Sequence, residues 1–274
     1  MPTPRSTASL RNAAGRRGAR VRLRTWRRSL TALSRAVGQG FSSGDGVPDV
    51  LAPGPHAERF VLDKGPWRPS ARPRQGRLGD CWVMASMLAV HETAPERLQA
   101  LMSRQQDGTV TVHLPGARGP VTVDRLMPAD AAGTFVYGRQ DSGSPGWVGV
   151  LEKAVALQLA GGYRFLQRGF GKFGLELLLG EKARTLLLLP SARQIASWRA
   201  EHRAILASTH PLSGRVGTAH GTLPSNHVFA VVGAEPSSGH VLLRNPVRPG
   251  RVLRVDARTF RRGFISVDVT SPLR

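Results

Sequence analysis

A single cysteine, Cys81, stands in a setting that is typical of a catalytic nucleophile. It is the only cysteine in 274 residues, and it follows the run Gln75-Gly-Arg-Leu-Gly-Asp and precedes an apolar stretch with helical spacing. The free backbone N–H groups and the dipole of a helix N-terminus stabilise a thiolate at that position. A lone cysteine is more often a buried structural residue, but the glutamine and the glycine-rich turn upstream favour catalysis.

Three further residues supply what a cysteine nucleophile needs. The side-chain amide of Gln75 can stabilise an oxyanion together with the backbone N–H of Cys81, unless it is merely an exposed loop residue. His227 begins the apolar run His-Val-Phe-Ala-Val-Val and can act as the base, with His220, in a Gly/Ser/Thr-rich loop, as the rival. Asn245, 18 positions after His227, can orient the imidazole, although an Asn-Pro pair is also a common turn.

Other chemistries find little support. One cysteine rules out an internal disulfide and a cysteine-rich zinc site. The remaining histidines lack metal-ligand spacing, and no GxSxG, P-loop or GxGxxG motif is present. No apolar run approaches the roughly 20 residues that span a bilayer. We therefore expect no cofactor and, with a single thiol and no secretory signal, a cytoplasmic location.

The charge is strongly positive, with 39 basic and 18 acidic residues and a net charge of +21. Residues 1–55 are predicted to be a basic, largely disordered tail and linker, because ten arginines precede the first acid, Asp45. Within this segment Trp26, Leu30, Leu33 and Val37 have the spacing of a short amphipathic helix, which is the alternative. An anionic partner for the tail, whether acidic protein, membrane surface or nucleic acid, and a merely basic proteome both remain open.

Hydrophobic periodicity predicts a helical first half and a β-rich second half. Helices are expected over 81–101, with Asp80 as N-cap and Pro95 as a break or restart, over 147–160, and over 191–208, with Ser191 as N-cap. Residues 169–180 are expected to form a glycine-rich loop that leads to a further short helix. Strands are expected over 109–114 and 120–126, as a hairpin, and over 228–234, 240–244, 251–255 and 264–269.

Several motifs make the chain resemble the protease core of calpains, which are papain-like cysteine peptidases. They run in family order over about residues 60 to 250 and are Trp67-Arg-Pro69, Gln75-Gly-Arg-Leu-Gly-Asp-Cys-Trp82, Asp107-Gly-Thr-Val-Thr-Val112, Val121-Thr-Val-Asp124, Trp147 with Leu151-Glu-Lys-Ala154, Gly162-Tyr163, His227-Val-Phe-Ala-Val231 and Leu243-Arg-Asn-Pro246.

The resemblance implies an α+β fold of two lobes with the active site in the cleft between them. Residues 56–188 would form the helical lobe with Cys81 and Gln75, and residues 189–274 the β-rich lobe with His227 and Asn245. It also implies a cysteine endopeptidase, here expected to be bacterial, that acts on protein or peptide substrates through a thioester acyl-enzyme. An acyl or peptidyl transferase with the same triad, and a non-catalytic basic binding protein on this fold, are the alternatives.

The chain departs from the calpain pattern in three places. Val247 stands where the family usually has a tryptophan that shields the His–Asn hydrogen bond from water. Two acidic calcium ligands of animal calpains align with Arg72 and Arg164, and a cation cannot ligate a cation. Nothing resembles the accessory calcium-binding domains. We therefore expect an enzyme without the calcium switch of animal calpains, although calcium binding through other ligands is not excluded by these positions.

Overall fold

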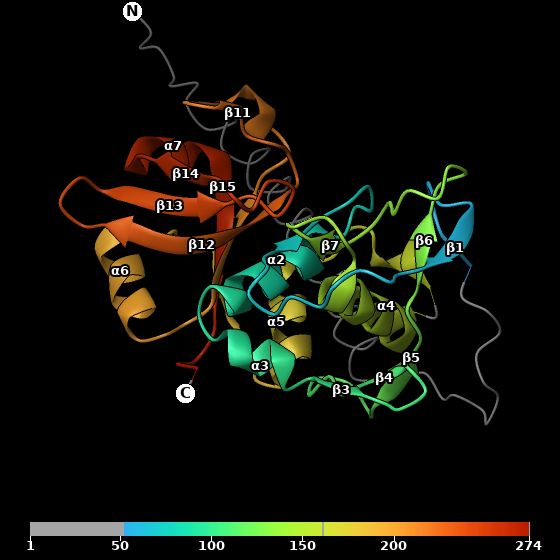
Figure 1. Cartoon of the computed structure of the whole chain (residues 1–274). Helices are drawn as coiled ribbons and strands as arrows, with labels where there is room; N and C mark the ends of the chain where they lie inside the picture. Colours follow the sequence, from blue (N-terminus) through green and yellow to red (C-terminus); the bar gives the residue numbers. More distant parts are fainter. Residues whose placement is uncertain (1–51, 161, 274) are drawn as a thin grey trace, which may run out of the picture. The chain divides into compact units, whose positions relative to one another are not determined.

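The largest sheet of the protein has six antiparallel strands and comes from the C-terminal part of the chain (Figure 1). The structure is a computed structural model that describes residues 52–160 and 162–273. In spatial order the strands of this sheet are β14 (Val252–Val255), β13 (His240–Arg244), β12 (Val228–Glu235), β9 (Ile205–Thr209), β15 (Phe264–Val269) and β8 (Arg184–Leu186).

The hairpin of β12 and β13 follows directly from the local sequence. Two apolar runs flank the turn from Glu235 to Gly239, and Gly239 has a φ of 73°, a left-handed conformation that glycine adopts without steric cost. The two strands pair with Ala230 opposite Arg244. This register places the start of β12 beside the end of β13, and thus His227 near Asn245.

Helices dominate the first part of the described chain. They are α2 (Cys81–His91), α3 (Pro95–Gln99), α4 (Gly146–Ala160) and α5 (Gly171–Leu179), and α6 (Ala192–Ala200) and α7 (Ala257–Gly263) follow with the large sheet; short 3₁₀ turns are η1 (Tyr163–Leu166) and η2 (Ser213–Arg215). Helix α2 packs against α5 on one side and against β12 and β9 on another. Every residue of α2 from Cys81 to Val90 is buried.

Four small sheets complete the structure, and all of their pairings are antiparallel. They are β1 (Arg59–Leu62) with β6 (Leu126–Ala129), β2 (Pro73–Arg74) with β7 (Arg139–Gln140), β3 (Met102–Arg104) with β4 (Val110–Val112) and β5 (Val121–Val123), and β10 (Gly217–Thr218) with β11 (Gly221–Thr222).

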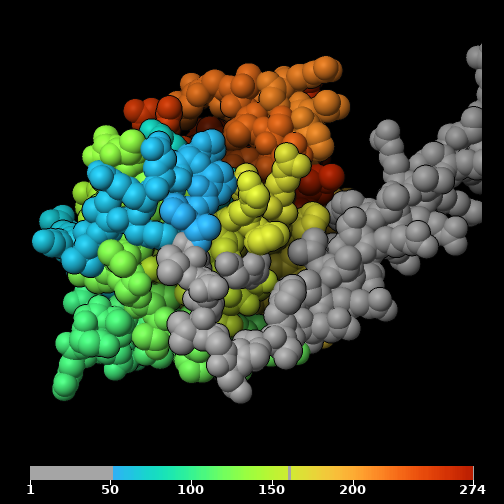
Figure 2. Space-filling model, turned by 90° about the vertical axis from the view of Figure 1, so that its right-hand side faces the viewer, coloured from blue at the N-terminus to red at the C-terminus, as the bar shows by residue number. Residues whose placement is uncertain are grey.

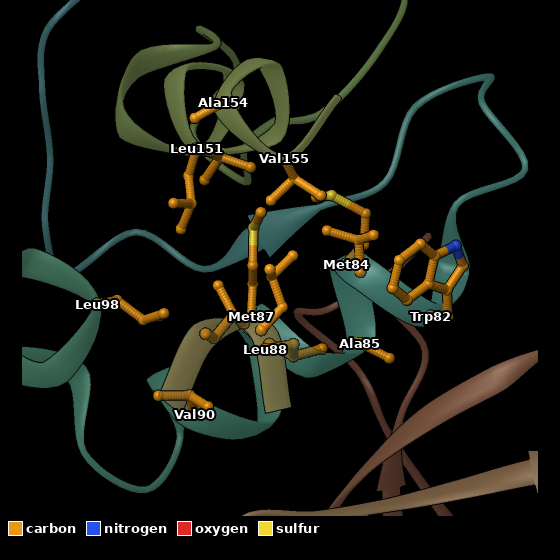
Figure 3. Close-up of a cluster of buried hydrophobic side chains, with 14 of the residues drawn as sticks. Trp82, Met84, Ala85, Met87, Leu88, Val90, Leu98, Leu151, Ala154 and Val155 are labelled. Atoms are coloured by element: carbon orange, nitrogen blue, oxygen red, sulfur yellow. The ribbon is translucent and has the colours of Figure 1, made fainter. Parts of the chain in front are cut away.

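The buried side chains form two hydrophobic clusters. The larger contains α2, and in it Leu151 and Val155 of α4 point toward Met87 and Met84 of α2 (Figure 3). The smaller lies within the large sheet and its helices α6 and α7. On the molecular face in Figure 2, the segments coloured orange to red and those coloured blue to yellow occupy separate regions.

Most of the predicted elements are confirmed. Pro95 begins α3 after a break that follows α2, and the Ser191 side chain accepts a hydrogen bond from the backbone N–H of Gln194 at the start of α6. The predicted hairpin is present as β4 and β5, and the four strands expected after residue 227 are present as β12, β13, β14 and β15.

Two predictions of local structure are wrong, and a third, the N-cap at Asp80, is confirmed in position only. Residues 205–208 belong to the strand β9, not to a helix, because this short apolar run pairs with β12 and β15 in the middle of the sheet. The segment 169–180 is mostly the helix α5, which ends at Gly180 with a φ of 72°. Asp80 occupies the N-cap position of α2 but its side chain makes no capping hydrogen bond.

The predicted amphipathic spacing of Trp26, Leu30, Leu33 and Val37, and the predicted tail and linker as far as residue 51, lie outside the described residues. The domain boundaries after residues 55 and 188 stay predictions. Among the residues that the structure describes, no helix has both the length and the apolar character needed to cross a membrane.

Truncation of a core leucine should show that the cluster around α2 and α4 carries much of the stability. Leu151→Ala removes a fully buried side chain and should lower the free energy of unfolding by about 2–5 kcal/mol, because it leaves a cavity. Leu188→Ala makes the same chemical change at a side chain that is 89% exposed and should have little effect. Urea unfolding of both variants measures the difference, and equal effects would contradict this view of the core.

Candidate active site

The Cys81 thiol lies where α2 meets the large sheet. Cys81 is the first residue of α2, and its sulfur accepts a hydrogen bond from the backbone N–H of Val228, the first residue of β12. Burial raises the pKa of the thiol to about 11, and the charge of Asp80 contributes to this rise; the backbone N–H groups of Val228, Trp82 and Cys81 act in the opposite direction. The thiol is therefore neutral at physiological pH in this arrangement.

His227 and Asn245 are joined by a hydrogen bond. The distance from His227 Nε2 to Asn245 Oδ1 is 2.9 Å, and Asn245 Oδ1 also accepts from the backbone N–H of Val247 at 3.0 Å. A backbone N–H can only donate, so it identifies this atom of the amide as the oxygen. His227 Nε2 must therefore be the donor, and in the neutral imidazole Nδ1 then carries the free lone pair.

The imidazole is held in an apolar setting. Its ring meets the edge of Phe229 at a centroid distance of 5.2 Å. Burial lowers the pKa of His227, and the hydrogen bond with Asn245 opposes that shift. Among the contacts of the described residues there is no hydrogen bond between Cys81 and His227, although Val228 brings the thiol to the residue next to His227. The Cys81 thiol and the His227 imidazole are thus both neutral at physiological pH in this structure.

Gln75 is buried in the loop that leads to Cys81. Its Nε2 donates one hydrogen bond to the backbone oxygen of Leu78 at 2.7 Å, which leaves the second N–H of the amide for another acceptor. Its backbone N–H donates to Pro246 O at 2.9 Å. This bond fixes the Gln75 loop to the residue that follows Asn245.

The other residues singled out in the sequence lie elsewhere. His220 is exposed in the turn between β10 and β11. Val247 is 38% exposed, so only a small and open side chain follows the His–Asn pair. Arg72 donates from Nε to Glu92 Oε1 at 2.5 Å, and Arg164 is exposed in η1. These two cations do not fit a calcium site.

No cluster of three or more His, Cys, Asp or Glu side chains suited to a metal ion occurs within residues 52–160 and 162–273. Instead, arginines surround the C-terminal end of α2. Besides Arg72, Arg244 of β13 places its Nε 3.4 Å from Glu92 Oε1, and Arg199 of α6 donates to the backbone oxygen of Glu92 at 2.9 Å. Cations at this end of a helix interact favourably with its dipole and its free carbonyl groups.

A buried pair of carboxyl groups next to Cys81 escaped the sequence analysis. Asp80 and Glu152 are both buried and close enough to affect each other's pKa, and both Glu152 oxygens accept from the backbone N–H of Gly138, at 3.1 and 3.0 Å. Neither carboxylate oxygen of Asp80 has a hydrogen-bond partner among the described residues. Burial raises the pKa of Asp80 to about 7 and that of Glu152 well above its ordinary value, so both carboxyl groups keep their protons to a higher pH than exposed carboxyl groups do. A glutamate among the apolar residues of 147–160 was the signal for such a role.

Comparison with known proteins identifies the family of the chain. The model of the family described as "Calpain family cysteine protease" matches residues 68–248, a range that contains Gln75, Cys81, His227 and Asn245. The chain belongs to the calpain family of cysteine proteases.

Curated relatives come from plants. The calpain-type cysteine proteases DEK1 of Arabidopsis thaliana and ADL1 of Oryza sativa subsp. japonica are each 26% identical to this calpain-family chain over 189 residues. DEK1 of Zea mays is 26% identical over 187 residues. The matches cover 63% of the present chain but only 9% of each relative, so the chain spans a small part of the length of these proteins.

Two glycines in the Gln75–Cys81 loop allow a matched test of its geometry. A Cβ at Gly76 would lie 2.2 Å from the backbone oxygen of Val136, whereas a Cβ at Gly79 would meet only the Gln167 side chain, at 3.6 Å. Gly76→Ala should lower the free energy of unfolding by about 1–3 kcal/mol. It should also change the rate at which iodoacetamide alkylates Cys81, because the loop must shift. Gly79→Ala should change neither quantity, and equal behaviour of the two variants would contradict the close approach.

The buried carboxyl pair predicts a pH dependence of stability. A carboxyl group whose pKa is higher in the folded than in the unfolded protein stabilises the fold at low pH, and this contribution is lost as the pH rises through the folded pKa. Because of the pair, the free energy of unfolding should therefore fall as the pH rises from about 4 to the Asp80 pKa of about 7. Asp80→Asn cannot ionise and should flatten this fall.

Urea unfolding across that pH range measures the effect. Asp107→Asn is the control, because Asp107 is exposed and hydrogen bonds from Thr109 lower its pKa, so its contribution has the opposite sign. An unchanged pH profile for Asp80→Asn would show that the pair is not protonated in the folded protein.

Proposed function

We propose that the protein is a cysteine endopeptidase that hydrolyses peptide bonds through a thioester acyl-enzyme, with Cys81, His227, Asn245 and Gln75 as its catalytic residues. The observation that supports the proposal is a pair of contacts, one at the Cys81 thiol and one at the His227 imidazole. The backbone N–H of Val228 interacts with the Cys81 sulfur. The preceding residue, His227, donates a hydrogen bond from Nε2 to Asn245 Oδ1, which leaves the free lone pair of the neutral imidazole on Nδ1.

The chemistry starts from the neutral pair. As the Cys81 sulfur attacks the peptide carbonyl carbon, its proton passes to Nδ1 of His227, and a C–S bond forms. The backbone N–H of Cys81 and the free N–H of the Gln75 amide stabilise the oxyanion. The C–N bond then breaks, and His227 gives the proton to the leaving amine. Water hydrolyses the thioester after giving a proton to His227, and that proton returns to the thiolate.

Asn245 acts on His227 rather than on the substrate. Its carboxamide oxygen holds the Nε2–H tautomer and stabilises the imidazolium that forms during each proton transfer. Val247 offers little shelter to this hydrogen bond, so water has better access to it than beneath a tryptophan. The edge of Phe229 supplies an apolar contact to the imidazole instead.

The hydrophobic clusters support a two-lobe, papain-like arrangement, with the cluster around α2 in one lobe and that of the large sheet in the other. Activity without a calcium switch is supported by Arg72, whose guanidinium bonds to Glu92, and by the exposed cation Arg164. A cytoplasmic location and an anionic partner for the Arg-rich residues 1–55 stay predictions.

The deciding experiment is labelling of the full chain by E-64, a cysteine-directed epoxide, read by mass spectrometry with and without EGTA. Labelling at Cys81 should occur in both conditions and disappear in Cys81→Ala. It should slow by at least about a hundredfold in His227→Ala, because the base is lost. His220→Ala, the same change at an exposed histidine, is the matched control and should label normally.

Each other result has a definite meaning. Labelling that persists in His227→Ala would show that His227 is not the base. Labelling that EGTA abolishes would show that other ligands hold a required calcium ion. No labelling of the wild-type protein would favour a non-catalytic binding protein on this fold.

A further inference from the structure

Three arginines gather around Gln75 from two elements. Arg74 of β2 pairs directly with Arg139 of β7, and opposite residues in an antiparallel ladder bring their side chains together when they share a face. Arg77 follows Gln75 by two residues, and its backbone N–H donates to Val136 O in the segment that leads to β7. We call Arg74, Arg77 and Arg139 the arginine cluster.

The positive charge of this cluster is poorly compensated within the protein. Arg77 is 61% exposed, and its Nη1 lies 4.0 Å from Asp130 Oδ2, the limit of an ion pair. Neither Arg74 nor Arg139 forms an ion pair with an acid of the described residues. Arg139 donates instead to the backbone oxygen of Phe135, and Arg74 Nε is buried without a hydrogen-bond partner.

Holding these groups together costs stability. Like charges directly opposite each other destabilise a strand pair. Burial lowers the pKa of Arg139, and the charges of Arg74 and Arg77 lower it further, which means that both of these guanidinium groups repel that of Arg139. An arginine that served only as a soluble surface residue would gain nothing from this placement, whereas an anion bound among the three would relieve the repulsion.

The position of the arginine cluster relative to the proposed catalytic residues indicates which side of the scissile bond it would contact. The backbone N–H of Gln75, between Arg74 and Arg77 in the chain, donates to Pro246 O, next to Asn245. The cluster therefore lies on the side of Cys81 where the His227–Asn245 pair stands. Because His227 protonates the leaving amine, that is the side of the substrate C-terminal to the scissile bond.

We propose that the arginine cluster binds acidic side chains of the polypeptide substrate on the C-terminal side of the scissile bond. This inference rests on the proposed endopeptidase function and names a feature of its substrates. An extended peptide advances about 3.3 Å per residue, so the favoured acids lie within the first few residues after the bond that is cleaved. Guanidinium groups suit this role because they bind a carboxylate through two parallel hydrogen bonds.

The test uses substrates that the enzyme itself selects. Digestion of casein by the full chain, with the products read by mass spectrometry, identifies a cleaved sequence. Peptide pairs are then made that differ only in Glu against Gln at each position after the scissile bond. Wild type should prefer Glu by about tenfold in kcat/KM at the best position, the sum of modest contributions from partly exposed charges. The preference should shrink as salt is added.

Substitutions in the cluster separate recognition from catalysis. The double variant Arg77→Gln/Arg139→Gln should bring the Glu-to-Gln ratio close to one, and Arg77→Glu should lower this ratio more than Arg77→Gln does. Arg118→Gln removes the same charge from an exposed residue between β4 and β5 and should keep the wild-type ratio. E-64 labelling of each variant reports whether the catalytic residues remain assembled.

The failures of the two proposals are distinguishable. If wild type labels and cleaves casein but shows no preference for Glu, or if Arg118→Gln loses the preference equally, the role of the arginine cluster is refuted while the protease remains. If wild type does not cleave, binding of a hexaglutamate peptide to the full-length Cys81→Ala variant is measured by fluorescence anisotropy. Binding that the double variant does not weaken more than Arg118→Gln overturns the proposal, and weaker binding in the double variant alone supports it.

Discussion

The position of the site residues depends on the burial of α2 from Cys81 to Val90. A helix with one apolar face can rotate or slide on its support, but α2 is enclosed from Cys81 to Val90 by α5, by the large sheet and by side chains of α4 (Figure 3). Interiors packed to this density resist displacement, because any shift opens voids on one side and clashes on the other. The position of the Cys81 sulfur is therefore set by the packing of the whole helix.

The same burial accounts for the electrostatic state of the site. It disfavours the charged form of each ionisable group, and so it raises the pKa of Cys81, Asp80 and Glu152 and lowers that of His227. Few local interactions oppose it, chiefly backbone N–H groups at the thiol and the Asn245 oxygen at the imidazole. The Cys81 thiol and the His227 imidazole are thus both neutral at physiological pH.

The sequence was most informative where local signals and tertiary structure agree. The β12–β13 hairpin has two apolar runs and a glycine turn, and α3 begins at a proline, so short-range rules suffice for both. Strand β9 was missed because Ile205-Leu-Ala-Ser-Thr209 is short and follows a helical pattern without a turn residue, and only its pairing partners decide its structure. The place of Asn245 beside His227 was predictable from the hairpin, and the tautomer became assignable only through the Val247 N–H. The Asp80–Glu152 pair joins residues far apart in the chain, which no spacing rule can connect.

The Arg72–Glu92 contact also has a consequence for control of the protein. The guanidinium group of Arg72 is covalently part of the chain and cannot diffuse away. Its presence beside Glu92 therefore does not depend on the composition of the surrounding solution. A diffusible ion in the same place would make the link responsive to its own concentration and would let it be broken by a competing chelator. The covalently tethered cation of Arg72 gives this contact permanence in place of that responsiveness.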